Sequence, residues 1–222
     1  MKNLFLVTSK SFLRHHYLTL LVLFFGVFTP LVVFGNLAED VLENEVFSFD
    51  RPVLMFMHNH ATQILDMVMI FFTRVGSALV LVPINILVFS LLIYRKRGRE
   101  ALFWVLAVMG AALLNFIAKH AFVRIRPDLW ISIAPEVTYS FPSGHAMNSL
   151  ATIAALIVLA WDTRWRSLMM AAGACFILLV GLSRIYLGVH YPSDVMAAWS
   201  ASFAWVVGLA SVLTDRWSRR VP

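Results

Sequence analysis

Histidine, arginine, lysine and aspartate side chains gather in three short polar clusters that lie just outside long apolar blocks of the sequence. The clusters are Lys119–Pro127, Pro142–His145 and Ser183–Asp194. Polar groups are costly next to a bilayer core, so such positions are candidates for function. Histidine beside aspartate suits nucleophilic and acid–base chemistry, and arginine with lysine suits phosphate binding. The clusters together predict a phosphate site with a histidine nucleophile.

Composition places the chain in a membrane. Its 222 residues are 60% hydrophobic and only 14% charged, and the mean hydropathy is +0.80. A soluble domain carries about 25% charged residues. The net charge of +6 does not point to nucleic acid, because the basic residues are scattered in short groups beside apolar blocks. Cys175 is the single cysteine, which excludes an intrachain disulfide, and we expect it to be a small buried hydrophobe.

Six apolar blocks predict an all-α bundle of six transmembrane helices in a single domain covering residues 1–222. They span about 17–35, 76–94, 101–122, 145–161, 167–184 and 194–213. The fourth is short for a hydrocarbon core of about 30 Å, so we expect its helix to begin near Ser143, with Trp161 as an interfacial anchor. The first block reads as an uncleaved helix, because its apolar stretch exceeds a signal core and no A-x-A site follows.

A shorter segment, 62–75, predicts an amphipathic or re-entrant helix near the membrane interface or packed against the bundle. The five acidic residues before it belong to the first outer loop, where we expect a solvated face: Glu39, Asp40, Glu43, Glu45 and Asp50.

Lysine and arginine positions orient the bundle. With six spans and a cytoplasmic N-terminus, the cytoplasmic segments are 1–16, 95–100, 162–166 and 214–222. They hold twelve of the eighteen basic residues, namely Lys2, Lys10, Arg14, Arg95, Lys96, Arg97, Arg99, Arg164, Arg166, Arg216, Arg219 and Arg220. This distribution follows the positive-inside rule. It predicts cytoplasmic termini and puts all three polar clusters at the outer face of the cell (inner) membrane.

The first cluster pairs a lysine with an arginine. Lys119 and Arg126 are seven positions apart, so they share a helix face if the helix persists that far. Pro127 then ends the helix or turns the chain. An arginine fork and a lysine point charge fit a phosphate well.

The second cluster opens the fourth span. A helix N-terminus presents free N–H groups to an anion. Gly144 permits close backbone approach, and the Ser143 hydroxyl can donate to a phosphate oxygen. His145 is placed to protonate a leaving oxygen.

The third cluster holds the remaining groups. Pro192 opens a helix well at its first turn, so Asp194 falls in that turn, four residues after His190. Its carboxylate can hold one ring nitrogen and aim the other at phosphorus, or cap the helix, or do both. Arg184 supplies a further positive charge for the phosphoryl oxygens.

These residues resemble the type 2 phosphatidic acid phosphatase superfamily of integral membrane lipid phosphatases. Its pattern, K-x6-R-P, P-S-G-H and S-R-x5-H-x3-D, is matched at all eleven specified positions within residues 119–194. The resemblance implies that His190 attacks phosphorus and forms a phosphohistidine, that Asp194 holds His190, and that His145 acts as general acid. The phosphoryl group is then bound by Lys119, Arg126, Ser143, Gly144 and Arg184.

The implied activity is removal of phosphate from undecaprenyl pyrophosphate, phosphatidylglycerophosphate or phosphatidic acid. No metal or other cofactor is implied, because fixed cations stabilise the transition-state charge, and Asp194 is the only acid within the clusters. The partners expected are the lipid substrate and membrane lipids, without an obligate protein partner. Two alternatives stay open: a lipid-to-lipid phosphotransferase, and a non-catalytic lipid-phosphate binder or transporter.

Other polar residues have weaker interpretations. Arg124 is an extra cation that either senses a second phosphate or forms a loop salt bridge. The H-x-H pair His58 and His60 lacks further metal ligands. His120 is a candidate neighbour of the site, and the last two histidines are expected at the interface: His15 and His16.

Overall fold

A computed structural model of the chain describes residues 17, 19–45 and 47–214. These residues contain helices and loops and no strand, which confirms the all-α prediction for this part of the chain. The elements are η1 (Phe24–Phe28, a π-helical turn), α2 (Thr29–Leu42), α3 (Asp50–Asn59), α4 (Gln63–Val75), α5 (Ala78–Tyr94), α6 (Gly98–Phe122), α7 (Gly144–Leu159), α8 (Arg166–Tyr186) and α9 (Pro192–Leu213).

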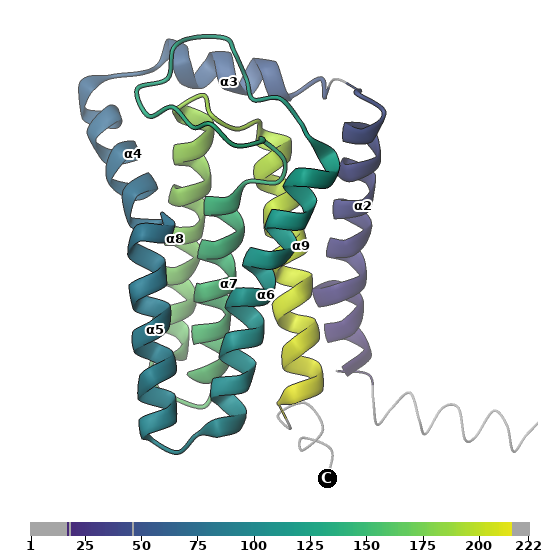
Figure 1. The fold of residues 1–222 in the computed structure, drawn as a ribbon, viewed down its shortest axis with the longest axis vertical. Helices are drawn as coiled ribbons and strands as arrows, with labels where there is room; N and C mark the ends of the chain where they lie inside the picture. The colour runs from purple at the N-terminus through teal and green to yellow at the C-terminus, as the bar shows by residue number, and fades with distance from the viewer. Residues whose placement is uncertain (1–16, 18, 46, 215–222) are drawn as a thin grey trace, which may run out of the picture.

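The long helices run side by side, and α3 lies across one end of the bundle (Figure 1). At that end α2, α6 and α8 finish, and α7 and α9 begin. Short connections 95–97 and 160–165 join helices at the opposite end. A long irregular segment, 123–143, returns from α6 to α7 over the end that α3 crosses.

Among the described residues, four helices are long and apolar enough to cross a membrane: Thr19–Leu42, α6, α8 and α9. The pair α4 and α5, bent by 41°, counts as a fifth if it is one span. Helix α7 has 16 residues and is about 24 Å long at 1.5 Å per residue, below the core thickness of about 30 Å. The predicted boundaries of the second to sixth spans lie within three residues of the observed helix ends.

The segment before α4 differs from the sequence prediction. The first apolar helix continues to Leu42 instead of ending near 35. Glu39 lies on the exposed side of this helix, so the helix can continue through it without burying a charge. Helix α3 was not predicted, and it buries Asp50 to 2% exposure; the expected solvated face is therefore wrong for this residue. Helix α4 packs against α8, so of the two alternatives for 62–75 the packed one holds.

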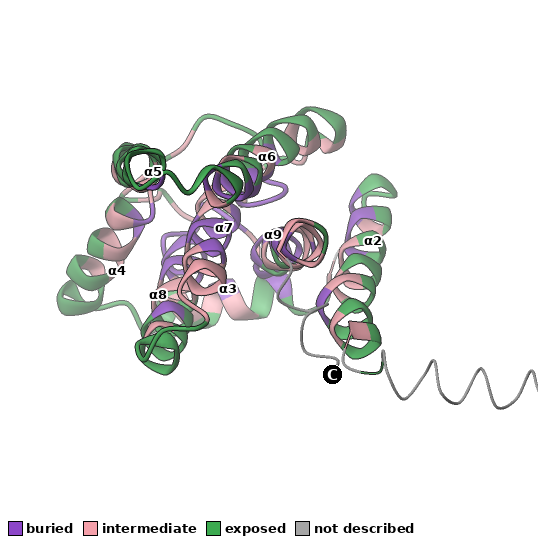
Figure 2. Ribbon diagram, turned by 90° about the horizontal axis from the view of Figure 1, so that it is seen from below, coloured by how far each residue is buried: buried purple, intermediate pink, exposed green. Residues whose placement is uncertain are grey.

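Helix α7 occupies the centre of the bundle, where Figure 2 shows buried residues gathered on α7 and on the facing side of α9. It packs against α5, α6, α8 and α9. Its buried positions include Ala146, Ala151 and Ala155, whose small side chains let the neighbouring helices approach closely. Close packing around α7 fixes the start of this helix, and that start carries the second polar cluster.

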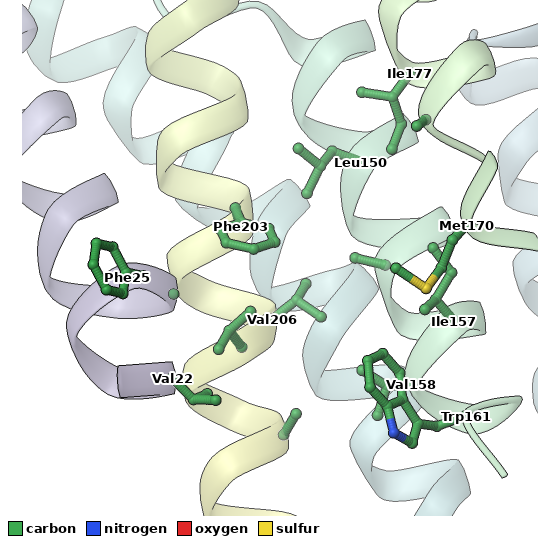
Figure 3. A pocket seen from close by; sticks show the side chains of 15 residues that line it. Val22, Phe25, Leu150, Ile157, Val158, Trp161, Met170, Ile177, Phe203 and Val206 are labelled. Carbon is green, nitrogen blue, oxygen red and sulfur yellow. The ribbon is translucent and has the colours of Figure 1, made fainter. Parts of the chain in front are cut away.

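An apolar cavity of about 500 Å³ lies between η1, α7, α8 and α9. Figure 3 shows side chains such as Phe25, Met170 and Phe203 around it. The cavity is lined by apolar side chains, so it is not a candidate for chemistry. On α8, Cys175 is exposed and not buried as predicted, because the outer face of a membrane helix is apolar without being covered by protein.

Candidate active site

All three polar clusters lie at the end of the bundle that α3 crosses (Figure 1). Lys119 is in the last turn of α6, Ser143 directly precedes α7, and His190 lies in the turn between α8 and α9. Residues far apart in the sequence thus meet at one rim. This is the convergence that the span order predicts.

His190 and Asp194 form a buried pair, with exposures of 1% and 0%. Nδ1 of His190 lies 3.3 Å from Oδ2 of Asp194. The same carboxylate oxygen accepts the N–H of Tyr191 at 2.9 Å and the hydroxyl of Ser140. Because Asp194 stands in the first turn of α9, it caps the helix and contacts the imidazole at once.

The second ring nitrogen of His190 faces a cation. Nη1 of Arg126 lies 3.1 Å from Nε2 of His190. A guanidinium can only donate, so Nε2 is the acceptor and the ring proton is on Nδ1, toward Asp194. Burial lowers the pKa of His190 to about 3, although Asp194 acts in the opposite direction. At neutral pH the ring is therefore uncharged and keeps a lone pair on Nε2.

Arg126 reaches this position from the loop and not from a helix. Helix α6 ends at Phe122, and Val123 has a left-handed φ of 50°. The helix therefore does not persist to Arg126, and the condition for a helix face shared with Lys119 is not met. The 123–143 loop brings them together instead. Arg126 donates to the carbonyl oxygen of Thr138 at 2.6 Å, and Lys119 donates to the carbonyl oxygen of Tyr139.

A carboxylate that the sequence analysis missed lies among the cations. Glu136 of the 123–143 loop receives a hydrogen bond from Arg184 and another from Arg126 at 3.1 Å. Its Oε1 lies 3.6 Å from Nδ1 of His145. Burial raises the pKa of Glu136, but the neighbouring cations, Arg184 first and Arg126 as well, contribute to an opposite effect that lowers it overall. Glu136 is thus an anion held by cationic groups.

Arg184 is anchored from two sides. It is 2% exposed, and Nη1 donates to the hydroxyl of Thr73 on α4 while Nη2 donates to Glu136. Within the described part of the chain its Nε has no hydrogen-bond partner. Helix α4 therefore helps to aim a guanidinium of α8 into the site.

The second cluster forms the start of α7, with Ser143 as the residue before the first helical turn. The buried Oγ of Ser143 has no hydrogen-bond partner among the described residues, so it is free to bind a ligand. A Cβ on Gly144 would lie 3.1 Å from Oδ1 of Asn115, and this amide is held by its bond to the Pro142 carbonyl oxygen at 3.0 Å. Glycine at 144 thus avoids a tight contact with the Asn115 amide.

A polar pocket of about 180 Å³ opens beside these groups. Its lining includes Lys119, Glu136, Thr138, Gly144 and His145. One cation from α6, one imidazole from α7 and the loop carboxylate thus share a single space with room for a small anion.

Arg124 contacts the oxygen of Asp194 that does not face His190. Nη1 of Arg124 lies 2.5 Å from Oδ1 of Asp194 and 2.8 Å from the Ser193 hydroxyl, and Nη2 lies 3.0 Å from Oδ2 of Asp50. Its guanidinium also stacks over Tyr191 at 4.2 Å. Burial raises the pKa of Asp50, and its bonds to Ser193 and Arg124 oppose this effect. Of the two interpretations of Arg124, the structure contains the salt bridge.

The other histidines have separate surroundings. His58 stacks on Trp130 with ring centres 4.3 Å apart, and Nδ1 of His60 lies 2.8 Å from the Phe56 carbonyl oxygen. His120 contacts the Phe116 carbonyl oxygen at 2.8 Å. His15 and His16 lie outside the described residues. No group of three His, Cys, Asp or Glu side chains suited to a metal ion occurs in residues 19–45 and 47–214.

Known proteins share this sequence and fold. The chain is 26% identical over 191 residues to an undecaprenyl-diphosphatase of Sulfolobus acidocaldarius, covering 84% of this chain and 85% of that protein. It is 30% identical over 169 residues to phosphatidylglycerophosphatase B of Bacillus subtilis, covering 74% and 83%. The crystal structure of a transmembrane PAP2 type phosphatidylglycerolphosphate phosphatase from Bacillus subtilis superposes with a TM-score of 0.75 at 25% identity, over 85% of this chain and 95% of that one.

The family assignment rests on more than half of the chain. Residues 100–218 match the PAP2 superfamily, and this region contains all three motif clusters from Lys119 to Asp194. The resemblance read from the motifs is confirmed, and the chain belongs to the PAP2 superfamily of membrane phosphatases.

Proposed function

We propose that this protein is a metal-independent membrane phosphohydrolase that dephosphorylates lipid phosphates or pyrophosphates through a phosphohistidine. The observation that carries the proposal is the neutral His190, with Nδ1 directed at Asp194 and Nε2 at Arg126. A neutral imidazole whose unprotonated nitrogen faces a phosphate-binding cation is arranged to attack phosphorus.

In the first chemical step, Nε2 of His190 forms a bond to phosphorus, and the bond from phosphorus to the leaving oxygen breaks. His145, in the protonated form that the negative charge of the bound phosphate favours, gives its proton to that oxygen. The phosphorylated imidazole keeps its proton on Nδ1 and becomes cationic, and the carboxylate of Asp194 stabilises this charge. Arg126 and Arg184 hold the phosphoryl oxygens as their charge redistributes.

In the second step, water attacks phosphorus and the nitrogen–phosphorus bond breaks. His145 accepts a proton from the attacking water, and His190 returns to its neutral form. Lys119, with the Ser143 hydroxyl and the backbone at Gly144, completes the oxygen-binding set in the pocket. Each proton given in the first step is regained in the second, so the enzyme is restored.

We further propose six membrane crossings, with α4 and α5 as one bent span and α7 as a short one. The termini are then cytoplasmic, and the site is at the outer face of the cell membrane. The relatives act on undecaprenyl diphosphate and phosphatidylglycerophosphate, as their names state, so a lipid phosphate or pyrophosphate of this class is the substrate. A reporter fused to the C-terminus should score as cytoplasmic; an external score contradicts the orientation.

The central test is His190→Ala, purified in detergent and assayed for phosphate release from a panel of lipid mono- and pyrophosphates. We expect activity to fall at least a thousandfold, with His60→Ala as the matched control because His60 is exposed and outside the clusters. Wild-type activity should survive chelators, and acid-quenched enzyme should carry a phosphohistidine. Activity that persists in His190→Ala contradicts the proposal, and binding without turnover in the wild type indicates a lipid-phosphate binder.

A further inference from the structure

Glu136 occupies the place to which the phosphate-binding groups point. Its two carboxylate oxygens are contacted by Arg184, by Arg126 at 3.1 Å and by His145 at 3.6 Å. In the proposed mechanism Arg184 and Arg126 bind the phosphoryl oxygens, and His145 is the general acid beside them. A carboxylate can accept two parallel hydrogen bonds from an arginine guanidinium, as a phosphate does.

The position of Glu136 allows it to leave. It stands on the irregular segment 123–143, not on a helix, and its side chain is 27% exposed. Arg184 is 2% exposed and tied to Thr73 on α4, so the guanidinium is fixed and the carboxylate is the movable partner. An anion entering the pocket beside Lys119 therefore meets cations that already hold a negative group.

We infer that Glu136 is an internal competitor of the phosphoryl group, which the substrate must displace before it can bind. This inference rests on the proposed function. Competition of this kind raises the apparent dissociation constant of every ligand by the same factor, the inverse of the fraction of molecules with an open site. Because of Glu136, an anion occupies the site only if its affinity for the open site is high enough to offset this factor. We call this required affinity the threshold.

The threshold matters because the site lies in a bilayer. Most phospholipid headgroups are phosphodiesters with one negative charge on phosphate, whereas a phosphomonoester or pyrophosphate carries about two or more. Coulombic attraction grows with the charge of the ligand, so the ligand with more charge gains more from the same cations. A monoanionic diester then falls below the threshold, and the substrate stays above it. The same carboxylate favours release of the phosphate product.

The test compares Glu136→Gln with the wild type, using three probes: dimethyl phosphate as a monoanionic diester, inorganic phosphate and vanadate. We expect all three inhibition constants to fall about tenfold or more, and by a similar factor, because the competing charge is gone. The substrate KM should fall as well. Glu136→Ala serves as a second variant that cannot form a hydrogen bond. Glu45→Gln is the matched control, since it removes one exposed carboxylate far from these contacts and should change none of the constants.

Unchanged or weaker inhibition in both Glu136 variants overturns the inference. A loss of kcat with unchanged inhibition constants also overturns it, because it shows that Glu136 orients His145 instead. To separate this result from failure of the proposed function, inorganic phosphate binding is measured by calorimetry in His190→Ala and in the double variant with Glu136→Gln. Those measurements need no turnover, and tighter binding in the double variant is the expected result whatever the nucleophile.

Discussion

Asp194 receives Arg124 on the carboxylate oxygen that does not face His190, with 2.5 Å between Oδ1 and Nη1. The other oxygen contacts the imidazole, so Arg124 fixes the carboxylate that in turn fixes the ring. Arg124 is itself held by Asp50 at 3.0 Å. The pair of His190 and Asp194 thus has a support that begins on α3, outside the segment matched to the superfamily.

Arg124→Gln should therefore lower kcat about 10- to 100-fold, the usual cost of removing a partner that orients a functional group, with little change in KM. Asp50→Asn should show a smaller loss of the same kind. Arg124→Lys should recover part of kcat, because a lysine keeps the charge without the fork. Steady-state kinetics on one lipid monophosphate and one pyrophosphate provides the measurement. If KM rises only for the pyrophosphate while kcat holds, Arg124 instead binds a second phosphate.

The protonation state of His190 gives a prediction about pH. Burial lowers its pKa to about 3, so between the unfolded value of about 6.5 and 3 the unfolded chain binds more protons than the folded one. Stability from this group is complete above pH 6.5 and is lost as the pH falls. At about 1.4 kcal/mol per pKa unit, the loss between pH 6.5 and 5 is about 2 kcal/mol.

Chemical denaturation in detergent at several pH values checks this slope, and His190→Asn should reduce it by the amount due to His190. Nitrogen NMR of labelled histidine should show the His190 ring neutral, with its proton on Nδ1, at pH 5. Equal slopes in the two proteins, or a charged ring at pH 5, contradict the assigned state.

Close packing at the start of α7 predicts the effect of Gly144→Ala. The new methyl group lies 3.1 Å from Asn115 Oδ1, and Asn115 cannot yield without disturbing its bond to Pro142. Overpacking of this kind costs about 1–3 kcal/mol, and a small shift of the helix start should lower kcat/KM by about 10- to 100-fold. Gly98→Ala is the matched control, because Gly98 opens α6 and has nothing within 4 Å of the new atom. Thermal unfolding and kinetics should be normal or improved in this control.

Much of this arrangement could be predicted from the sequence. Long apolar blocks fixed the helices after residue 76 to within three residues, because lipid forces every span to satisfy its own backbone. Span order then placed His145 and His190 at the same end. Helix α3 and the course of the 123–143 loop over the site could not be predicted, since they depend on tertiary contacts and leave no periodic signal.

The sequence analysis did not identify Glu136 and Asp50 as partners of the buried cations, although the sequence contained one indication of such partners. The clusters carry four buried or half-buried cations against the single Asp194, and buried charges require partners. Charge balance would have directed attention to acids in the adjoining loops. Which acid serves which cation is decided by the loop fold: Glu136 faces Arg184, and Asp50 faces Arg124.

The anchoring of Arg184 by Thr73 leads to the last prediction. Thr73→Val keeps the shape of a side chain that is 6% exposed but removes the hydroxyl that accepts from Nη1. A buried charged donor left without its partner costs about 1.5–3 kcal/mol, and a less well aimed guanidinium should raise KM several-fold. Thr152→Val is the matched control: Thr152 is 2% exposed and its hydroxyl bonds to Asn85 at 3.3 Å, away from the cations. It should lower the unfolding temperature without changing KM. An equal KM in the two variants would show that α4 does not help to position Arg184.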